Sequence, residues 1–298
     1  MPKLHALVLS ALVVQALVIG SGVARAEDIQ GVIVRTLVIG ETSRLVGDVT
    51  CRVVAAPCIS FGAPDISLNL NGFTITGQGD PATGCRGAAV ANEIGITTNG
   101  QANVGVRGPG LIQRFQGDGI LFIASAKGWA QGVTTTTNCF SGIRIAPTSS
   151  GISVEGNVSV RNGQTANPCG GICILGSNNS LRYNETSGNG YAAGPAPNFG
   201  IGILAGNNNL VEANTAVGNS NGIIVGPAAT NSVVRQNVVV GNPPIQVANS
   251  VPTSAGVDIW DQSAPSNNNV FLGNMCVTAI NAPCPSIPSQ AVPRKPAN

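Results

Sequence analysis

A short pattern that recurs between Gly142 and Asn274 constrains the fold more than any other feature of this sequence. Each copy holds two asparagines five residues apart, with an apolar residue three positions before the first asparagine. The complete pairs are Asn157/Asn162, Asn184/Asn189, Asn214/Asn219 and Asn237/Asn242, and Asn274 begins a fifth copy that lacks the second asparagine. A repeat of this kind predicts stacked structural units.

A glycine-led apolar segment precedes each copy of the pattern. These segments start at Gly142-Ile143, Gly171-Ile172, Gly200-Ile201, Gly222-Ile223 and Gly256-Val257. Short strands and turns that repeat every ~22 residues or more favour a solenoid, because a β-sandwich would show shorter and less regular spacing. With ~4.8 Å per coil, we expect roughly ten coils in a rod about 50 Å long.

The first 26 residues have the features of a secretory signal peptide. Lys3 is followed by an almost wholly apolar run over 6–23, and Ala24-Arg25-Ala26 forms a small-x-small cleavage signal. This arrangement predicts cleavage before Glu27 and a periplasmic or secreted protein; a retained membrane anchor is the alternative. No later apolar run reaches the ~20 residues that a membrane-spanning helix needs, so we expect no span after cleavage.

Cleavage also changes the charge. It removes Lys3 and Arg25, which reduces the 15 basic residues to 13 and makes them equal to the 13 acidic ones. The single histidine, His5, leaves with the signal peptide. A neutral chain with scattered arginines argues against nucleic acid as a partner, because nucleic-acid-binding surfaces usually form a basic stripe.

Eight cysteines follow the predicted cleavage site, an even number that favours disulfides in an oxidising compartment. Local pairing would join Cys51 to Cys58, Cys169 to Cys173 and Cys276 to Cys284, leaving Cys85 and Cys139 to link distant segments, although spacing alone does not prove the connectivity. Without histidine or a C-x2-C pair, we expect no metal site.

The two ends of the predicted solenoid differ from its middle. We expect 27–284 to form the repeat domain, with Glu27 to Asp48 as a cap, because terminal units must shield an apolar cross-section. Residues 285–298 contain Pro285, Pro288, Pro293 and Pro296 among small and polar residues, a composition that predicts a disordered tail.

Two further strings carry a resemblance to a known family. LNLNGFTITG (68–77) and VRGPGLIQRFQGDGI (106–120) resemble successive coils of the pectin-lyase-like superfamily, and the glycine-led and asparagine repeats resemble its generic repeat. The resemblance implies an all-β fold, a single-stranded right-handed parallel β-helix. It does not imply one reaction, because this scaffold carries lyases, hydrolases, epimerases, adhesins and non-enzymatic periplasmic proteins.

The asparagines have a functional and a structural interpretation. They could hydrogen-bond sugar hydroxyls, or they could take left-handed turn conformations at the corners and stack as amide ladders. Their fixed register favours the structural interpretation. Two positions before the first asparagines stand Glu155, Arg182, Glu212 and Arg235, which predict an outward ladder of alternating charge that stabilises the coil register.

The remaining charged residues supply only isolated catalytic candidates. These are Asp118, Lys127, Arg144, Asp258 and Asp261. The resemblance implies Arg or Lys as the base beside calcium or Arg in a lyase, and clustered Asp residues in a glycosidase. No paired-carboxylate motif is present, so we expect no cofactor, with calcium entering only if the protein is a lyase.

Long segments before the glycine-led strands, 163–170, 190–199 and 243–255, are expected to project from one corner and to wall a groove. Trp129, Tyr191, Phe199 and Trp260 lie in or near them and could stack on sugar rings, or simply cover loop edges. The sequence therefore predicts binding of an extended carbohydrate polymer along one sheet face. A polysaccharide lyase or glycoside hydrolase and a purely structural or surface protein are the alternatives, and the oligomeric state stays open.

Overall fold

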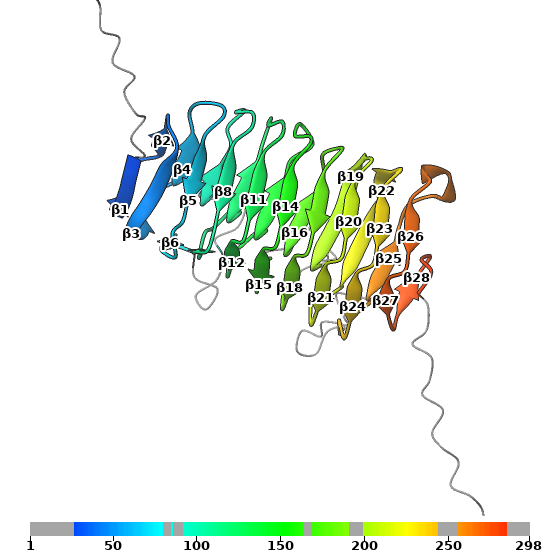
Figure 1. The fold of residues 1–298 in the computed structure, drawn as a ribbon. Coiled ribbons are helices and arrows are strands. Elements are labelled where there is room, and N and C mark those ends of the chain that lie inside the picture. Colours follow the sequence, from blue (N-terminus) through cyan, green and yellow to red (C-terminus); the bar gives the residue numbers. More distant parts are fainter. Residues whose placement is uncertain are drawn as a thin grey trace, which may run out of the picture.

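The computed structural model describes residues 27–79, 85, 92–163, 169–190, 199–243 and 256–284. The predicted signal peptide, the tail from 285 and most of the three long corner segments lie outside these residues. The described chain forms a right-handed parallel β-helix in which strands from successive coils pair in parallel (Figure 1). One sheet holds one strand from each of ten coils, which confirms the predicted all-β solenoid and its length.

Two sheets enclose the core. The ten-stranded sheet consists of β2 (Leu37–Ile39), β4 (Ile59–Phe61), β7 (Ile96–Thr97), β10 (Ile120–Phe122), β13 (Ile143–Ile145), β16 (Ile172–Ile174), β19 (Ile201–Asn207), β22 (Ile223–Thr230), β25 (Ile259–Asp261) and β28 (Ala279–Ile280). The 18-stranded sheet bends at a corner, so that most coils contribute two strands to it. It consists of β1 (Glu27–Ile33), β3 (Ser43–Cys51), β5 (Ser67–Asn69), β6 (Thr74–Thr76), β8 (Gly105–Arg107), β9 (Leu111–Gln113), β11 (Trp129–Gln131), β12 (Thr134–Thr136), β14 (Ser153–Glu155), β15 (Val158–Val160), β17 (Ser180–Arg182), β18 (Glu185–Ser187), β20 (Leu210–Glu212), β21 (Thr215–Val217), β23 (Val233–Arg235), β24 (Val238–Val240), β26 (Val270–Leu272) and β27 (Met275–Cys276).

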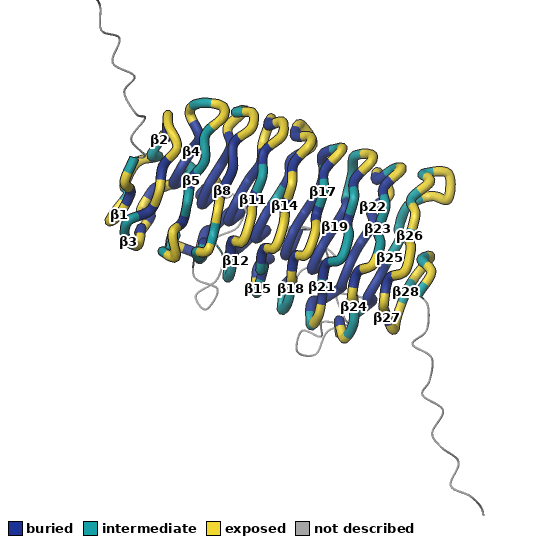
Figure 2. The backbone as a smooth tube through the Cα atoms, viewed as in Figure 1, coloured by how far each residue is buried: buried dark blue, intermediate teal, exposed yellow. Residues whose placement is uncertain are grey.

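The direction of each side chain follows from the strand period of two. In the 18-stranded sheet the middle residue of each three-residue strand points inward, as Val154, Leu181 and Val211 do in consecutive coils. In the ten-stranded sheet the first and third residues point inward, so that Ile143 and Ile145 are buried and Arg144 lies on the outer surface. Figure 2 shows the resulting column of buried residues along the rod.

Buried asparagines link each coil to the next at the corners. The side-chain oxygen of Asn184 accepts hydrogen bonds from the backbone nitrogen and Nδ2 of Asn157, both at 3.0 Å. Its own Nδ2 donates to the carbonyl of Val154 and to Oδ1 of Asn214, both at 2.9 Å. The same pattern joins Asn162, Asn189, Asn219 and Asn242 at the next corner. The asparagines are therefore structural, as their register predicted.

The left-handed corner residue is not the asparagine itself, which corrects one detail of the prediction. The residue directly before it has positive φ, as in Gly156 (63°), Tyr183 (55°), Ala213 (54°) and Gln236 (56°). That residue turns the chain, while the following asparagine directs its amide into the interior, where it can meet the amides of neighbouring coils.

The N-terminal segment is built as ordinary coil and not as a separate cap. Strand β1 pairs in parallel with β3 along its length, apart from one irregularity between Ile29 and Gly31. Ile29 and Ile39 are buried in this first coil. The segment expected to cap the rod, Glu27 to Asp48, thus continues the two sheets because its apolar residues have the strand period.

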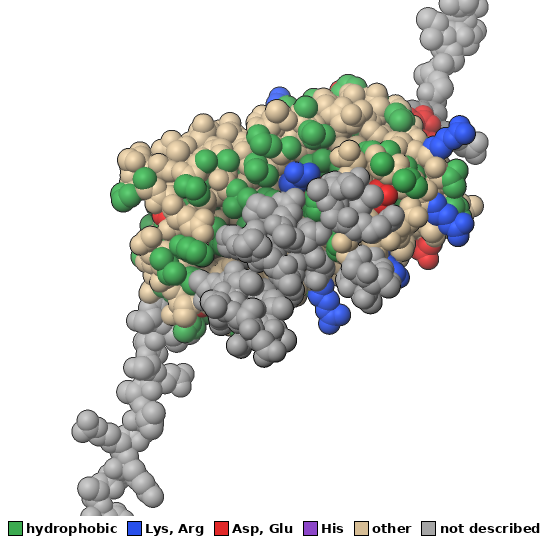
Figure 3. Space-filling view, turned by 180° about the vertical axis from the view of Figure 1, so that it is seen from behind, with side chains coloured by type: hydrophobic (Ala, Val, Ile, Leu, Met, Phe, Trp, Pro, Cys, Tyr) green, Lys and Arg blue, Asp and Glu red, His purple; other side chains and the backbone are tan. Residues whose placement is uncertain are grey.

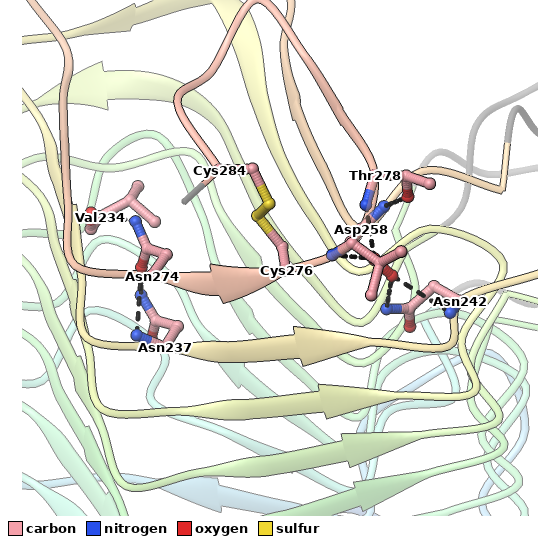
Figure 4. Close-up of a disulfide and its surroundings, with 9 residues drawn as sticks. Val234, Asn237, Asn242, Asp258, Asn274, Cys276, Thr278 and Cys284 are labelled. Atoms are coloured by element: carbon pink, nitrogen blue, oxygen red, sulfur yellow. Dashed lines mark hydrogen bonds between the residues drawn. A yellow bond between two sulfur atoms is a disulfide. The ribbon is translucent and has the colours of Figure 1, made fainter. Parts of the chain in front are cut away.

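Four disulfides join the cysteines in the pairs that local spacing suggested. They are Cys51–Cys58, Cys85–Cys139, Cys169–Cys173 and Cys276–Cys284. The last of them anchors the end of the described chain to β27 (Figure 4). Among the described residues, none forms a helix long and apolar enough to cross a membrane.

Candidate functional site

Six neighbouring strands of the 18-stranded sheet present a continuous row of side chains to solvent. We call the outward residues of β8, β11, β14, β17, β20 and β23 the ladder face. Their third positions carry Arg107, Gln131, Glu155, Arg182, Glu212 and Arg235, and their first positions carry Gly105, Trp129, Ser153, Ser180, Leu210 and Val233. Strand pairing fixes both columns, so each coil adds one polar or charged side chain to the row of third positions.

Trp129 is the aromatic residue at the centre of the N-terminal half of the ladder face. It pairs with Gly105 of the preceding coil, and its indole occupies the space that a Cβ at position 105 would need. The Arg107 guanidinium carbon lies 5.4 Å from the centroid of the ring. The ring is thus fixed against the sheet and stays half-exposed. Of the three predicted aromatic residues that the structure describes, Trp129, Phe199 and Trp260, it is the one on the ladder face.

Tyr183 is a second aromatic residue beside the ladder face, and the sequence analysis missed it. It directly follows Arg182 at the corner after β17 and is 63% exposed. The corresponding corner residues in the adjacent coils are Gly156 and Ala213, so no long side chain stands next to its ring at this corner. Its place directly before Asn184 of the repeat was the signal in the sequence that could have identified it.

The alternating charges of the ladder face lie in the predicted register. In the strand register, Arg182 lies opposite Glu155 of the preceding coil and Glu212 of the following coil, and Glu212 lies opposite Arg235. Glu212 forms ion pairs with both arginines, at 3.0 Å to Arg182 and 2.6 Å to Arg235. At the other end of the same column, Arg44 donates to Asp28 at 2.7 Å, and this hydrogen bond and charge raise the pKa of Arg44 above its ordinary value.

Reversing the charge of Arg182 tests this ladder. In the Arg182→Glu variant three carboxylates would lie next to one another, and we expect a loss of about 1 kcal/mol and a melting temperature lower by about 2–4 °C. Arg182→Gln serves as the matched control and should have a smaller effect. Added salt should narrow the difference between the two variants because it screens exposed charges. Equal melting temperatures at low salt would contradict a stabilising ladder.

Two catalytic candidates form a buried ion pair on the ten-stranded side. Asp118 is fully buried, and one of its carboxylate oxygens accepts from Nε of Arg144 at 2.8 Å and from its terminal nitrogen at 2.7 Å. The other oxygen accepts from the backbone nitrogen of Ser141 at 3.0 Å. Both groups are engaged by the fold, so neither is placed as a free acid or base.

The other catalytic candidates lie apart from this pair. Asp258 is buried in the ninth coil, where its carboxylate accepts four hydrogen bonds from Asn242 and from the backbone of Val277 and Thr278 (Figure 4). Asp261 accepts from the hydroxyl and backbone nitrogen of Ser263. Lys127 is exposed on the turn before β11. The described residues contain no group of three or more His, Cys, Asp or Glu that could hold a metal ion.

On the outer surface of the ten-stranded sheet, two of the predicted sugar-binding aromatic residues, Phe199 and Trp260, belong to an apolar cluster. Phe199 is fully buried with Cys169, Cys173 and Ile224, and its ring occupies the space above Gly202. It presents no face to a ligand, which corrects its assignment as a stacking residue. Trp260 packs against the same cluster and is half-buried. Tyr191 and most of the expected groove wall lie outside the described residues.

Comparison with known proteins supports the fold. A family model described as the right handed beta helix region matches residues 165–282, and no curated protein matches the sequence. Among solved structures, the Dettilon tailspike protein has a TM-score of 0.56 and 14% identity, covering 84% of this chain and 55% of that chain. The enzymatically active domain of bacteriophage CBA120 tailspike protein 2 has a TM-score of 0.53 and 11% identity, with 86% and 39% covered.

A third structure is a mutant tailspike protein of E. coli bacteriophage HK620 in complex with a pentasaccharide. It has a TM-score of 0.50 and 13% identity, covering 83% of this chain and 50% of that chain. The chain spans about half the length of these tailspikes or less. At such low identity the likeness establishes the fold alone, a right-handed parallel β-helix.

Proposed function

We propose that this protein binds an extended carbohydrate polymer along the ladder face, with Trp129 as the main contact. The observation that carries the proposal is the partly exposed indole held against Gly105, next to the exposed side chain of Arg107, which a sugar would displace from the ring. A rigid aromatic ring on a sheet offers the flat apolar surface on which the carbon–hydrogen face of a sugar packs. Because the sheet fixes the ring, little conformational entropy is lost on binding.

The polar column beside Trp129 supports a polymer in preference to a single sugar. Gln131, Glu155 and Arg182 follow one another in successive coils and are exposed. With ~4.8 Å between coils, these side chains supply hydrogen-bond donors and acceptors at regular intervals along the rod. Tyr183 lies beyond this column and would give a second stacking contact further along the same polymer.

We also propose that the protein acts outside the cytoplasm. Four disulfides need an oxidising compartment to form and persist. A face that binds a polymer would there meet polysaccharides of a cell surface or matrix.

Binding can be tested by native electrophoresis in gels that contain pectate, alginate or related polymers. We expect at least one polymer to retard the mature protein, and Trp129→Ala to weaken binding about tenfold or more, which corresponds to about 1.4 kcal/mol. Tyr183→Ala should have a smaller effect. Trp260→Ala is the matched control, since it removes the same ring from the opposite sheet.

Thermal melts of each variant separate lost binding from lost folding. The proposal is wrong if no polymer in the panel retards the protein, or if Trp260→Ala abolishes retardation while Trp129→Ala does not. Assaying the same mixtures for unsaturated or shortened products, with and without calcium, tests the alternative that the chain cleaves the polymer.

A further inference from the structure

The last coil of the rod ends in unpaired strand edges. Strands β26, β27 and β28 pair only with β23, β24 and β25 of the preceding coil, and no described strand pairs with their other edges. Such edges expose backbone donors and acceptors that readily pair with another chain. Natural proteins usually protect them with charged side chains, prolines or bulges.

The side chains of this coil are unusually apolar for a surface. Five large apolar residues of the coil are exposed: Val270 (41%), Leu272 (53%), Met275 (49%), Val277 (69%) and Ile280 (38%). A hollow of about 690 Å³ opens at this end, lined by Val270 and Phe271 and also by polar side chains that include Asp261. Phe271 continues the core column of Val211 and Val234, yet it is only half-buried, since no described coil follows it. The end of the core is therefore open among the described residues.

Charge is absent from the same region of the chain. Residues 262–284 contain no Asp, Glu, Lys or Arg. The first coil differs, because Glu27, Asp28 and Arg35 lie there. In Figure 3 no Lys or Arg side chain is visible over the last coils, on the left, whereas several are visible toward the N-terminal end on the right. The last coil itself therefore carries no charged residue, although Asp261 of the preceding coil lines the hollow.

We infer that two copies of this chain associate through their C-terminal coils, related by a two-fold axis across the rod. A two-fold interface places the same surface of each copy against the other, so an uncharged apolar end is self-complementary. Pairing of the free edges would bury Val270, Leu272, Met275 and Ile280. The product is a finite rod about twice the length of one copy.

Head-to-tail stacking, in which the first coil of one copy follows the last coil of another, is less favourable than the two-fold arrangement. The strand register runs without a break from Phe271 back to Glu27 and from Leu272 back to Asp28. A second copy that continued this register would therefore place Glu27 next to Phe271 in the inward column, and Asp28, which is paired with Arg44, next to Leu272 on the exposed ladder face. Burying the Glu27 carboxylate against apolar side chains is strongly unfavourable.

The chain's own tail is the other occupant to consider. Residues 285–298 follow Cys284 directly and contain Pro285, Pro288, Pro293 and Pro296. Proline has no backbone N–H and cannot donate to a strand ladder, so this segment is poorly suited to pair with the free edges as an eleventh coil. A second copy, which offers complete strand edges, suits them better.

Sedimentation velocity and small-angle X-ray scattering of the mature chain test the inference. We expect a dimer with a maximum dimension of about 100 Å, against about 50 Å for one rod. Leu272→Glu should raise the dissociation constant at least about a hundredfold, because it brings two unpaired carboxylates to the interface. The control Val34→Glu changes a valine of the first coil that is 64% exposed and should leave the dimer intact. Melting curves confirm that both variants fold.

Several results would overturn this arrangement. If the wild-type chain is a monomer at its highest soluble concentration, the inference is wrong. If deletion of 285–298 then produces a dimer, the tail covers the C-terminal coil in the wild-type chain. Dissociation by Val34→Glu would indicate head-to-tail stacking. A dimer no longer than one rod would indicate side-by-side association.

Discussion

Replacing Arg144 with methionine should lower the free energy of unfolding by about 3–5 kcal/mol, because it leaves the carboxylate of Asp118 buried and without its counter-ion. Asp118 is fully buried and keeps only the hydrogen bond from the backbone of Ser141. Methionine retains most of the apolar stem of arginine, so the loss reports on charge more than on packing. Urea denaturation followed by circular dichroism measures the change.

Two variants make this result specific. Adding Asp118→Asn to Arg144→Met should recover part of the lost stability, since a neutral amide is less costly to bury than a carboxylate. Arg235→Met removes an arginine from the exposed ladder, where its side chain is 42% exposed, and should cost less than about 1 kcal/mol. If Arg144→Met costs no more than Arg235→Met, the buried pair does not stabilise the coil.

The second large effect is expected at the asparagine ladder, from Asn214→Ala. Oδ1 of Asn214 accepts from the backbone nitrogen and from Nδ2 of Asn184, both at 2.9 Å, and its Nδ2 donates to the carbonyl of Leu181 at 3.0 Å. Truncation removes these bonds inside a corner where both asparagines are 1% exposed. At ~1–3 kcal/mol for each buried group left unsatisfied, we expect a loss of about 3–5 kcal/mol.

Asn207→Ala is the matched control for the ladder variant. Asn207 is exposed at the end of β19, and only its backbone groups take part in the coil-to-coil hydrogen bonds. Its replacement should change stability by less than about 0.5 kcal/mol. Amide hydrogen exchange adds a local measurement, because the backbone N–H of Asn184 should lose protection in Asn214→Ala. Unchanged protection would show that water or a rearranged neighbour replaces the amide.

The sequence predicted the repeating part of the fold well because each coil repeats the same local chemistry. The apolar residue three positions before the first asparagine became the inward residue of its strand, as Val154 and Leu181 illustrate. The alternating charges of Arg182, Glu212 and Arg235 were predicted from the same register and lie opposite one another in consecutive coils. The disulfide pairs also followed, since three of the four close short loops.

The candidate site was harder to predict, because it depends on contacts between coils of unequal length. Asp118 and Arg144 lie in adjacent coils but are 26 residues apart, whereas one coil here spans 23 residues, from Leu121 to Arg144, and the asparagine pattern that marks the coil length begins only later. Gly105 makes room for Trp129, and a glycine opposite a tryptophan in the next coil leaves no periodic signal. Phe199 was predicted either to stack on a sugar or to cover a loop edge, whereas its ring is buried over Gly202.

The carboxylate of Asp258 changes how one coil is joined to the next at the end of the asparagine column. It occupies the position after Asn242 in a column of asparagines, each of which accepts from the coil before and donates through its own amide nitrogen. An aspartate only accepts, and here the backbone nitrogens of Val277 and Thr278 take up its second oxygen, at 2.9 and 3.0 Å. The amide column therefore ends at Asp258, whose second oxygen joins it directly to the backbone of the last described coil.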